Sequence, residues 1–514
     1  MDSQARIRHN AQPTHPTDAN GSEKMLQKNA LTSGEDTLIG KHKNLPVVDG
    51  DEPPKEEGHL MKADRFKEFH RRIRGKHLET VPTFKESIIA TVRSSWVNLA
   101  LIIVVFSWVS HYKHWDERVT FILSFLALIP LEKLLQFGSR QSMLYLGSSV
   151  GDLVNVTLMN NISRSGIEAI LAILLLKRRC DLKLLQSTII GVTLLQLLLV
   201  PGCIFIAGGS RVVHQELHRS QTQLNQSLMT MGVMCLVIPV AFFVGITNIG
   251  ATSAETIATE HNRDLILKFS RGMAIIMLLV YIASRIYFIN PPGDENAGDY
   301  AEAGGHEAFK HEEERLKKEQ PVISPLFCFG FLVGLIIIIA FTAEWLVHSI
   351  DHVRHGAAIE EEWFGLVLIP LISFSGDGII TAGYLIRKTF FHGGKAPHTL
   401  ADARPIDLSI QFALFWTPLL ILIGWWINKP LPLLFDIFEV VLLVAACFVV
   451  NYITADAKTN WAEGWTMVSL YVIIALVAWF YPGQQYFSVL FPCIGGEEGG
   501  EGTTAIAEGS GGHH

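Results

Sequence analysis

Long apolar blocks separated by short polar segments fill the middle of the chain, between about residue 95 and residue 482. A helix needs about 20 consecutive apolar residues to cross the hydrocarbon core of a membrane, and about eleven blocks reach that length. Each block is continuously apolar rather than alternating, which excludes a membrane β-barrel. The pattern therefore predicts an all-α polytopic membrane protein. The predicted spans are 95–111, 119–137, 149–176, 185–208, 226–247, 269–289, 324–349, 363–386, 407–428, 431–453 and 465–482.

Two of these blocks contain a polar segment that is followed by an acid. The block 149–176 is too long for one straight helix, and polar residues occupy 160–166, just before Glu168. The block 363–386 repeats this pattern around Asp377. Non-helical backbone is tolerated at membrane depth where it is buried or lines a cavity, which is also where an ion can bind. We therefore predict a broken helix in each of the two blocks.

The two acids stand at matching places in the two halves of the chain. Glu168 opens the stretch E-A-I-L-A-I-L-L-L-K, and Asp377 opens D-G-I-I-T-A-G-Y-L-I-R-K. An ionisable side chain inside a membrane span is costly and is by default a functional-site hypothesis. Matching acids indicate a transporter built from two halves around a central cation site.

The overall composition, 49% hydrophobic and 18% charged, averages over polar ends and an apolar middle. This partition and the spans divide the chain into six predicted parts. They are a region that is disordered and then basic (1–93), a leading transmembrane helix (94–112), a first five-helix repeat (113–290), a charged cytosolic loop (291–322), a second five-helix repeat (323–482) and a disordered Gly/Glu-rich tail (483–514).

The distribution of charge says more about orientation than the net charge of −7 does. Basic residues cluster in 61–93, and the positive-inside rule assigns that end to the cytosol. The loop 291–322 follows six spans later and returns to the same side, whereas a basic run at 177–183 conflicts with this orientation. The basic segment 61–93 is also suited to anionic lipid, so membrane lipid is an expected partner.

Distinctive motifs occur in the C-terminal part of the chain, at 424–430, 434–439, 451–452, 456–464 and 475–482. They resemble the calcium/proton exchangers of the cation/Ca²⁺ exchanger superfamily, and the resemblance runs over roughly residues 95–482. It implies a leading helix and two inverted five-helix repeats with broken helices at the centre. It also implies exchange of Ca²⁺ for protons across the membrane of an acidic organelle such as the vacuole.

The two ion-binding motifs of that family, G-N-x-x-E-L and G-N-A-A-E-H, are altered in this chain. In the first motif Ser165 stands in place of the asparagine, and Glu168 keeps the acid. In the second motif Asp377 keeps an acid, whereas Phe374 and Gly378 replace the asparagine and the histidine. The resemblance therefore implies the exchanger fold with a modified ion site.

Calcium takes about six to eight oxygen ligands at about 2.3–2.6 Å. Two opposed acids with nearby amide, hydroxyl and carbonyl oxygens supply such a shell, and desolvated acids accept protons when the cation leaves. The alternative is that both acids are inert remnants held by local hydrogen bonds. The candidate ion-binding and proton-coupling residues are Glu168, Asp377, Ser165, Asn160, Gln196, Ser373, Ser375, Gln411 and Glu344, with Glu168 and Asp377 as the metal ligands.

Three candidates allow two interpretations each. Arg164 precedes Glu168 by one helical turn, where it either pairs with that acid and neutralises the site or extends towards the membrane interface. Gln196 and Gln411 occupy similar places in the two halves, each a few residues before a proline. Their amides are either neutral ligands of the cation or interhelical hydrogen-bonding groups.

Two further clusters of polar residues lie at span ends. Glu344 shares a helical face with His348, His352 and His355, a combination that suits a transition metal. The end of a span is also an ordinary place for polar side chains, and Glu344 alone is the better candidate for lining the pathway. The acids at 360–362 indicate either a cation-attracting vestibule or a solvated helix start.

The sequence predicts a transporter rather than an enzyme, because no hydrolase triad, phosphate loop or C-x-x-C pair is present. The predicted function is exchange of Ca²⁺ or another divalent cation for protons by alternating access, with no cofactor. One alternative is a monovalent cation/proton antiporter of the same fold. The other is a non-transporting membrane scaffold or regulatory paralogue.

Overall fold

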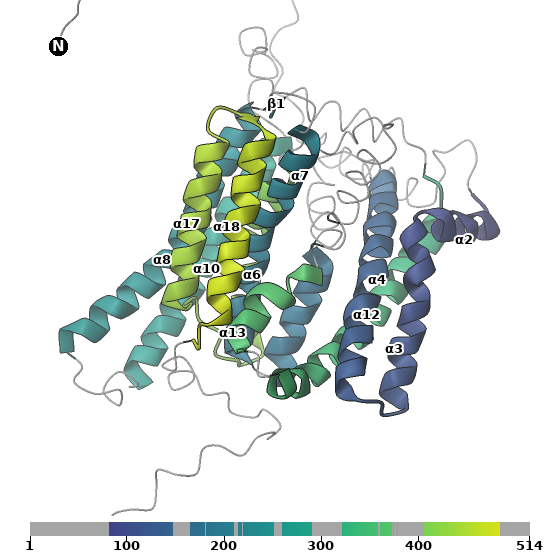
Figure 1. Cartoon of the computed structure of the whole chain (residues 1–514), viewed down its shortest axis with the longest axis horizontal. Helices are drawn as coiled ribbons and strands as arrows, with labels where there is room; N and C mark the ends of the chain where they lie inside the picture. The colour runs from purple at the N-terminus through teal and green to yellow at the C-terminus, as the bar shows by residue number, and fades with distance from the viewer. Residues whose placement is uncertain are drawn as a thin grey trace, which may run out of the picture. The chain divides into compact units, whose positions relative to one another are not determined.

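The structure is a computed structural model that describes residues 82–146, 165–179, 181–209, 214–217, 219–250, 260–289, 321–357, 360–372, 374, 378 and 404–483. Nearly all described residues outside the helix junctions are helical (Figure 1). The predictions of a disordered N-terminal region, a charged loop over 291–322 and a disordered tail lie almost wholly outside the described residues. So do parts of the third and eighth predicted spans.

The described helices run in chain order from α2 to α18, and the label η marks one 3₁₀ segment (η1) and four π-helical segments (η3, η4, η7 and η9). They are α2 (Phe84–Arg93), η1 (Trp96–Leu101), α3 (Ile102–Tyr112), α4 (Glu117–Leu146), η3 (Leu175–Arg179), α6 (Leu182–Leu194), η4 (Leu195–Leu199), α7 (Val200–Gly209), α8 (Arg219–Gly250), α10 (Glu260–Ile289), α12 (Pro325–Ala357), α13 (Glu361–Trp363), η7 (Phe364–Leu368), α15 (Arg404–Gln411), η9 (Phe412–Trp416), α16 (Thr417–Trp426), α17 (Ile437–Ile453) and α18 (Trp461–Trp479).

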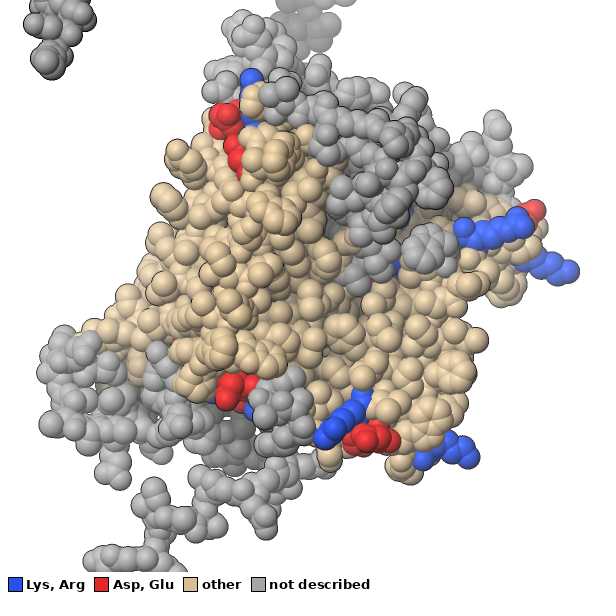
Figure 2. All heavy atoms as spheres, viewed as in Figure 1, with Lys and Arg blue, Asp and Glu red and all other residues tan. Residues whose placement is uncertain are grey.

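Seven helices within the described ranges are long and apolar enough to cross a membrane. A bent pair, α2 with the helix ending at Tyr112, and the shorter apolar α17 come close to that standard. Figure 2 shows charged side chains at opposite ends of the visible face, with a broad band lacking Lys, Arg, Asp and Glu between them. Such a band suits hydrocarbon, where charged groups are costly. The chain is therefore an integral membrane protein of helical class.

Local sequence explains where several spans begin. Asp181 caps α6, Asp436 caps α17 and Asn460 caps α18, each accepting hydrogen bonds from backbone N–H groups of the first turn. The predicted span 431–453 starts late, at Ile437, because Pro432 cannot donate a backbone hydrogen bond and the first cap lies at Asp436. Side-chain caps thus fix the helix starts more sharply than hydropathy does.

The helices of the two halves pack in reciprocal pairs. α7 packs on α18, and its counterpart in the second half, α16, packs on α10. α4 packs along α12 and α8 along α17, so each of these helices meets its own counterpart. Reciprocal packing of this kind is expected of two repeats related by a two-fold axis.

The helix that runs through α6, η4 and α7 lies at the centre of the packing. The most apolar stretch of Leu182–Gly209 is 83% buried and that of Ile406–Trp426 is 72% buried, whereas those of Asn262–Tyr287 and Pro325–Ile350 are each 33% buried. The two most buried spans are counterparts in the two repeats. They therefore form the interior of the protein, and the less buried helices face the lipid.

Two glycines allow α7 and α18 to lie in close contact. A methyl group at Gly202 on α7 would lie 2.9 Å from the carbonyl oxygen of Gly464 on α18. A methyl group at Gly464 would lie 2.7 Å from the carbonyl oxygen of Gly202. Small residues facing each other let two membrane helices approach closely. At the end of this helix pair, β1 (Gln215–Glu216) and β2 (Lys458–Thr459) form a short antiparallel pair in which Gln215 lies opposite Thr459.

Candidate functional site

The two glutamines predicted from the sequence lie at corresponding places in the two most buried spans. Gln196 is 4% exposed and lies inside η4, and Gln411 is 1% exposed and directly precedes η9. Pro201 and Pro418 follow within a turn or two, and each lacks the N–H that would close an α-helical hydrogen bond. Single π-helical turns of this kind are frequent at functional sites.

These two segments cross each other. α15 packs on η4, and α6 packs on η9, so each glutamine-bearing segment contacts the other half. The Ser409 hydroxyl donates to the carbonyl oxygen of Thr193 at 3.4 Å, which joins the two helices directly. Neither amide atom of Gln411 has a hydrogen-bond partner within the described ranges. A buried amide without partners is unusual and suits a ligand role.

The first predicted carboxylate is buried. Glu168 is 3% exposed and Ser165 is 4% exposed, on the helix that continues into η3. η3 packs against α6, which carries the first half of the crossing. A membrane-buried acid on a helix beside the centre is the arrangement that the sequence predicts. Asp377, Asn160, Arg164, Ser373 and Ser375 lie outside the described residues, so their roles stay predictions.

Two departures from the exchanger motif turn out to be sterically linked. A methyl group at Gly378 would lie 2.5–2.8 Å from the ring atoms of Phe374. A side chain at position 378 therefore requires the Phe374 ring to move. The two residues that the sequence analysis assigns to the altered second motif are thus in close contact.

Glu344 lies half-buried on α12, but its neighbours do not form a metal site. Nδ1 of His348 lies 3.9 Å from Glu117 Oε2, and His111 stacks on Trp345 with ring centroids 4.7 Å apart. No group of three or more His, Cys, Asp or Glu side chains among the described residues is placed to hold a metal ion. His111 and His348 instead contact each other, Trp345 and Glu117, where α3, α4 and α12 meet.

Glu132, a buried acid inside a predicted span, is absent from the candidates predicted from the sequence. Glu132 on α4 is 5% exposed, and its Oε1 accepts a hydrogen bond of 3.0 Å from the side chain of Gln136. Gln136 in turn accepts a bond of 3.1 Å from Lys133. The rule that singled out Glu168 applies equally here, because Glu132 falls inside the predicted span 119–137. Lys133, next to Glu132, makes this part of the span look like an ordinary charged segment in the sequence.

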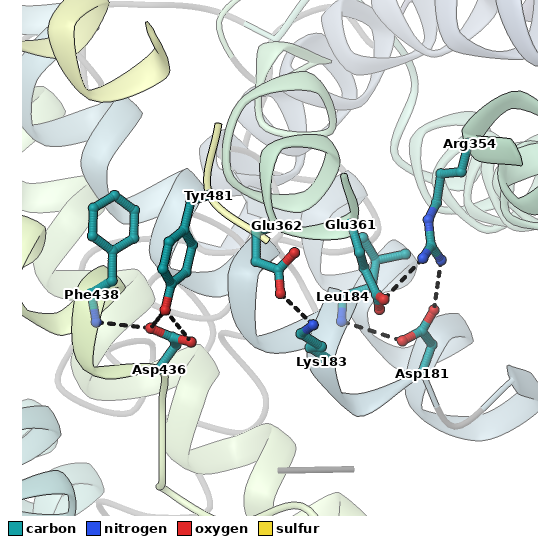
Figure 3. Close-up of polar contacts among 9 residues, drawn as sticks. All are labelled: Asp181, Lys183, Leu184, Arg354, Glu361, Glu362, Asp436, Phe438 and Tyr481. Atoms are coloured by element: carbon teal, nitrogen blue, oxygen red, sulfur yellow. Dashed lines mark hydrogen bonds and ion pairs between the residues drawn. The ribbon is translucent and has the colours of Figure 1, made fainter. Parts of the chain in front are cut away.

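An ion-pair cluster ties the start of α6 to the junction of α12 and α13 (Figure 3). Arg354 bridges two carboxylates, with Nη2 2.9 Å from Glu361 Oε2 and Nη1 3.8 Å from Asp181 Oδ2. Beside it, Lys183 forms an ion pair with Glu362, which is 2% exposed. The acids at 360–362 are thus only partly a solvated helix start: Glu360 is exposed, and Glu362 is buried.

The bridged carboxylates share their environment in a way that affects protonation. Burial raises the pKa of Asp181 to about 8, and the neighbouring Glu361 carboxylate raises it further, while Arg354 opposes both effects. Burial and the Glu361 carboxylate therefore outweigh the Arg354 guanidinium, and Asp181 keeps its proton to a higher pH than a solvated aspartate does. At the start of α15, the counterpart of α6, Arg285 forms a different pair with Asp407 at 2.6 Å. Ion pairs thus join the two repeats at the starts of both central spans.

Comparison with known proteins shows which family and which solved structures the chain resembles. Residues 327–480 match the family model described as sodium/calcium exchanger protein. The solved structure of native YfkE has a TM-score of 0.54 with 21% identity, covering 74% of this chain and 99% of that one. The H⁺/Ca²⁺ exchanger CAX has a TM-score of 0.51 with 14% identity, covering 79% and 91%. These likenesses confirm the exchanger fold.

Several proteins of similar sequence are named as calcium transporters or Ca²⁺/H⁺ antiporters. A vacuolar calcium ion transporter of Cryptococcus neoformans is 28% identical over 490 residues, covering 81% of this chain and 78% of the relative. One of Schizosaccharomyces pombe is 28% identical, covering 76% and 87%. A Ca²⁺/H⁺ antiporter of Aphanothece halophytica is 25% identical, covering 74% and 95%. The chain is therefore a divergent relative of the calcium/proton exchangers, as its motifs indicate.

Proposed function

We propose that this protein exchanges Ca²⁺ for protons across the membrane of a vacuole or another acidic organelle. The observation that carries the proposal is the buried acid Glu168, on a helix that packs beside the crossing of the two glutamine-bearing spans. The names of its relatives, vacuolar calcium ion transporters and Ca²⁺/H⁺ antiporters, support the same conclusion.

The proposed exchange requires that Ca²⁺ and protons bind the same carboxylates in turn and never at the same time. Ca²⁺ binds oxygen ligands, and Glu168 with the amides of Gln196 and Gln411 and the hydroxyl of Ser165 offers them in a water-poor interior. Asp377 adds the second negative charge. When the cation leaves, a desolvated carboxylate is costly unless it takes up a proton. Cation release to one side is thereby coupled to proton uptake from that side.

The two halves supply the movement that alternating access needs. The central spans come from different repeats and cross at Ser409 and Thr193, where relative motion changes the access to the centre. We place the N-terminus in the cytosol, on the basic segment 61–93. Lys183, part of the run that conflicts with this orientation, is held in an ion pair with Glu362 rather than facing lipid headgroups.

The test is uptake of Ca²⁺, Mn²⁺, Na⁺ and K⁺ into proteoliposomes after a pH jump, with wild type, Glu168→Gln and Asp264→Asn. Asp264 is exposed, its side chain 69% accessible, so its variant controls for loss of one acid. We expect divalent uptake by wild type and Asp264→Asn and none by Glu168→Gln. Uptake of Na⁺ or K⁺ alone would favour a monovalent cation/proton antiporter. If no ion is taken up, the protein is a non-transporting membrane scaffold or regulatory paralogue.

A further inference from the structure

Glu439, in the first turn of α17, is a buried acid that the central site does not use. The side chain is 1% exposed, and neither carboxyl oxygen has a hydrogen-bond partner anywhere in the described part of the chain. The Ser187 hydroxyl of α6 faces the carboxyl without reaching hydrogen-bonding geometry. A buried ionised carboxylate without a partner costs several kcal/mol, so this group needs a counter-charge or a proton.

The charged groups around Glu439 come from two other elements and from the cap of α17 itself. Lys183 extends from α6, Glu362 from α13 and Asp436 from the cap of α17, and Tyr481 follows α18. Two of these acids are already satisfied. Glu362 is paired with Lys183, and the Tyr481 hydroxyl donates to both oxygens of Asp436, at 2.9 and 3.0 Å (Figure 3).

The segment that follows α18 covers the ion pair of Lys183 and Glu362. A methyl group at Gly483 would lie 2.8 Å from Lys183 Nζ and would collide with the Glu362 carboxylate. The backbone at Gly483 therefore closes over the ion pair, and its positive φ of 75° favours glycine there. Lys183 is held on Glu362, so no second cation among the described residues is left for Glu439.

Charge and burial together indicate what Glu439 binds. Three carboxylates face a single ammonium group, and only Glu439 has neither an ion pair nor a hydrogen bond in the described structure. We propose that Glu439 is a proton-binding site, separate from Glu168, at the end of the protein where α6, α13 and α17 meet. Its ligand is a proton rather than a metal ion, since these side chains form no described metal-holding group.

The position of Glu439 connects it with the centre, and this step rests on the proposed function. α17 packs on both α6 and η4, and Ser187 precedes Gln196 by nine residues on one continuous helix. At 1.5 Å per residue, the two lie about 13 Å apart along the helix axis. Glu439 is thus a loading site, where protons bind on their way between that membrane face and the central carboxylates.

The direct test is infrared difference spectroscopy of the full chain in lipid during a pH titration. We expect a band from a protonated carboxylic acid that is absent in Glu439→Gln and unchanged in Glu360→Gln. Glu360 is exposed and makes no side-chain cap, so it is a control from the same end of the protein. Persistence of every such band in Glu439→Gln would overturn the proposal.

Two further measurements keep the result decisive. If Glu439→Gln does not fold, Ser187→Ala should shift the frequency of the same band without removing it, and an unshifted set of bands would also count against Glu439. In proteoliposomes, Glu439→Gln should change the dependence of exchange on the pH of the face that carries Tyr481, with exchange retained at the most favourable pH. The infrared result needs no transport, so it stands or fails independently of the proposed exchange.

Discussion

Replacing Gly191 with alanine tests the packing that holds the two halves together. A methyl group at this position on α6 would lie 2.3 Å from the carbonyl oxygen of Leu366 in η7, and 2.7 Å from its Cα. Side-chain Cβ atoms essentially never approach another atom within 3.0 Å, so α6 and η7 must separate by at least about 0.7 Å. The obstacle is backbone, which no rotamer change can remove.

The expected cost follows from two opposing effects. Overpacking a tight interior costs about 1–3 kcal/mol, and alanine in place of glycine in a helix gives back about 1 kcal/mol. The net loss of stability is therefore modest, about 0–2 kcal/mol. Transport should suffer more, because α6 leads to Gln196 and η7 leads towards Asp377. We expect initial Ca²⁺ uptake to fall at least tenfold.

Gly330 on α12 provides the matched control, because a methyl group there meets nothing within 4 Å. Gly330→Ala should be as active as wild type and equally stable or slightly more stable. The assays are thermal unfolding in detergent and Ca²⁺ uptake into proteoliposomes at equal reconstituted amounts. A Gly191→Ala protein as stable and as active as Gly330→Ala would refute the close contact between α6 and η7.

Three other changes probe the ion pairs and the central amide. Because the pKa of Asp181 is raised from 3.8 to about 8, the folded chain binds this proton more tightly than the unfolded chain does. Stability should therefore fall as pH rises between about 4 and about 8, and Asp181→Asn should flatten that slope in thermal unfolding, whereas Asp264→Asn should not. Lys183→Met should destabilise the folded protein by about 3–5 kcal/mol, because it leaves Glu362 buried and unpaired. Adding Glu362→Gln should recover much of this loss. If the effects of the two changes on stability simply add, the ion pair is contradicted. Gln411→Leu should unfold near the wild-type temperature but slow Ca²⁺ uptake, and normal uptake would assign Gln411 to packing alone.

The hydrophobic pattern predicts most of the architecture, because the residues of a helix are apolar where lipid or protein surrounds them and polar where water does. It predicts helices at nearly the correct places, and the similar placement of Gln196 and Gln411 indicates an internal repeat, with which the reciprocal packing of the helices agrees. It does not predict the start of α17, because hydropathy counts Leu431 and Leu433 as part of the span. Pro432 and the Asp436 cap decide that boundary instead.

The polar contacts of the site were harder to predict, since they join residues far apart in the chain. Glu362 belongs to a run of three acids that looks solvated, and its burial depends on Lys183 and on Gly483 above it. Glu439 looks like an ordinary acid in the first turn of a helix, and only the packing of α6 shows that it is enclosed. The fit between Phe374 and Gly378 likewise needs three-dimensional coordinates.

Simultaneous recording of Ca²⁺ and pH in proteoliposomes tests the central claim most directly. Wild-type protein should drive Ca²⁺ one way and protons the other, with both fluxes starting together on addition of Ca²⁺. Glu168→Gln should abolish both fluxes, while Asp264→Asn should leave both unchanged. Equal fluxes in wild type and Glu168→Gln, or Ca²⁺ movement without any proton movement, would contradict exchange at a buried carboxylate site.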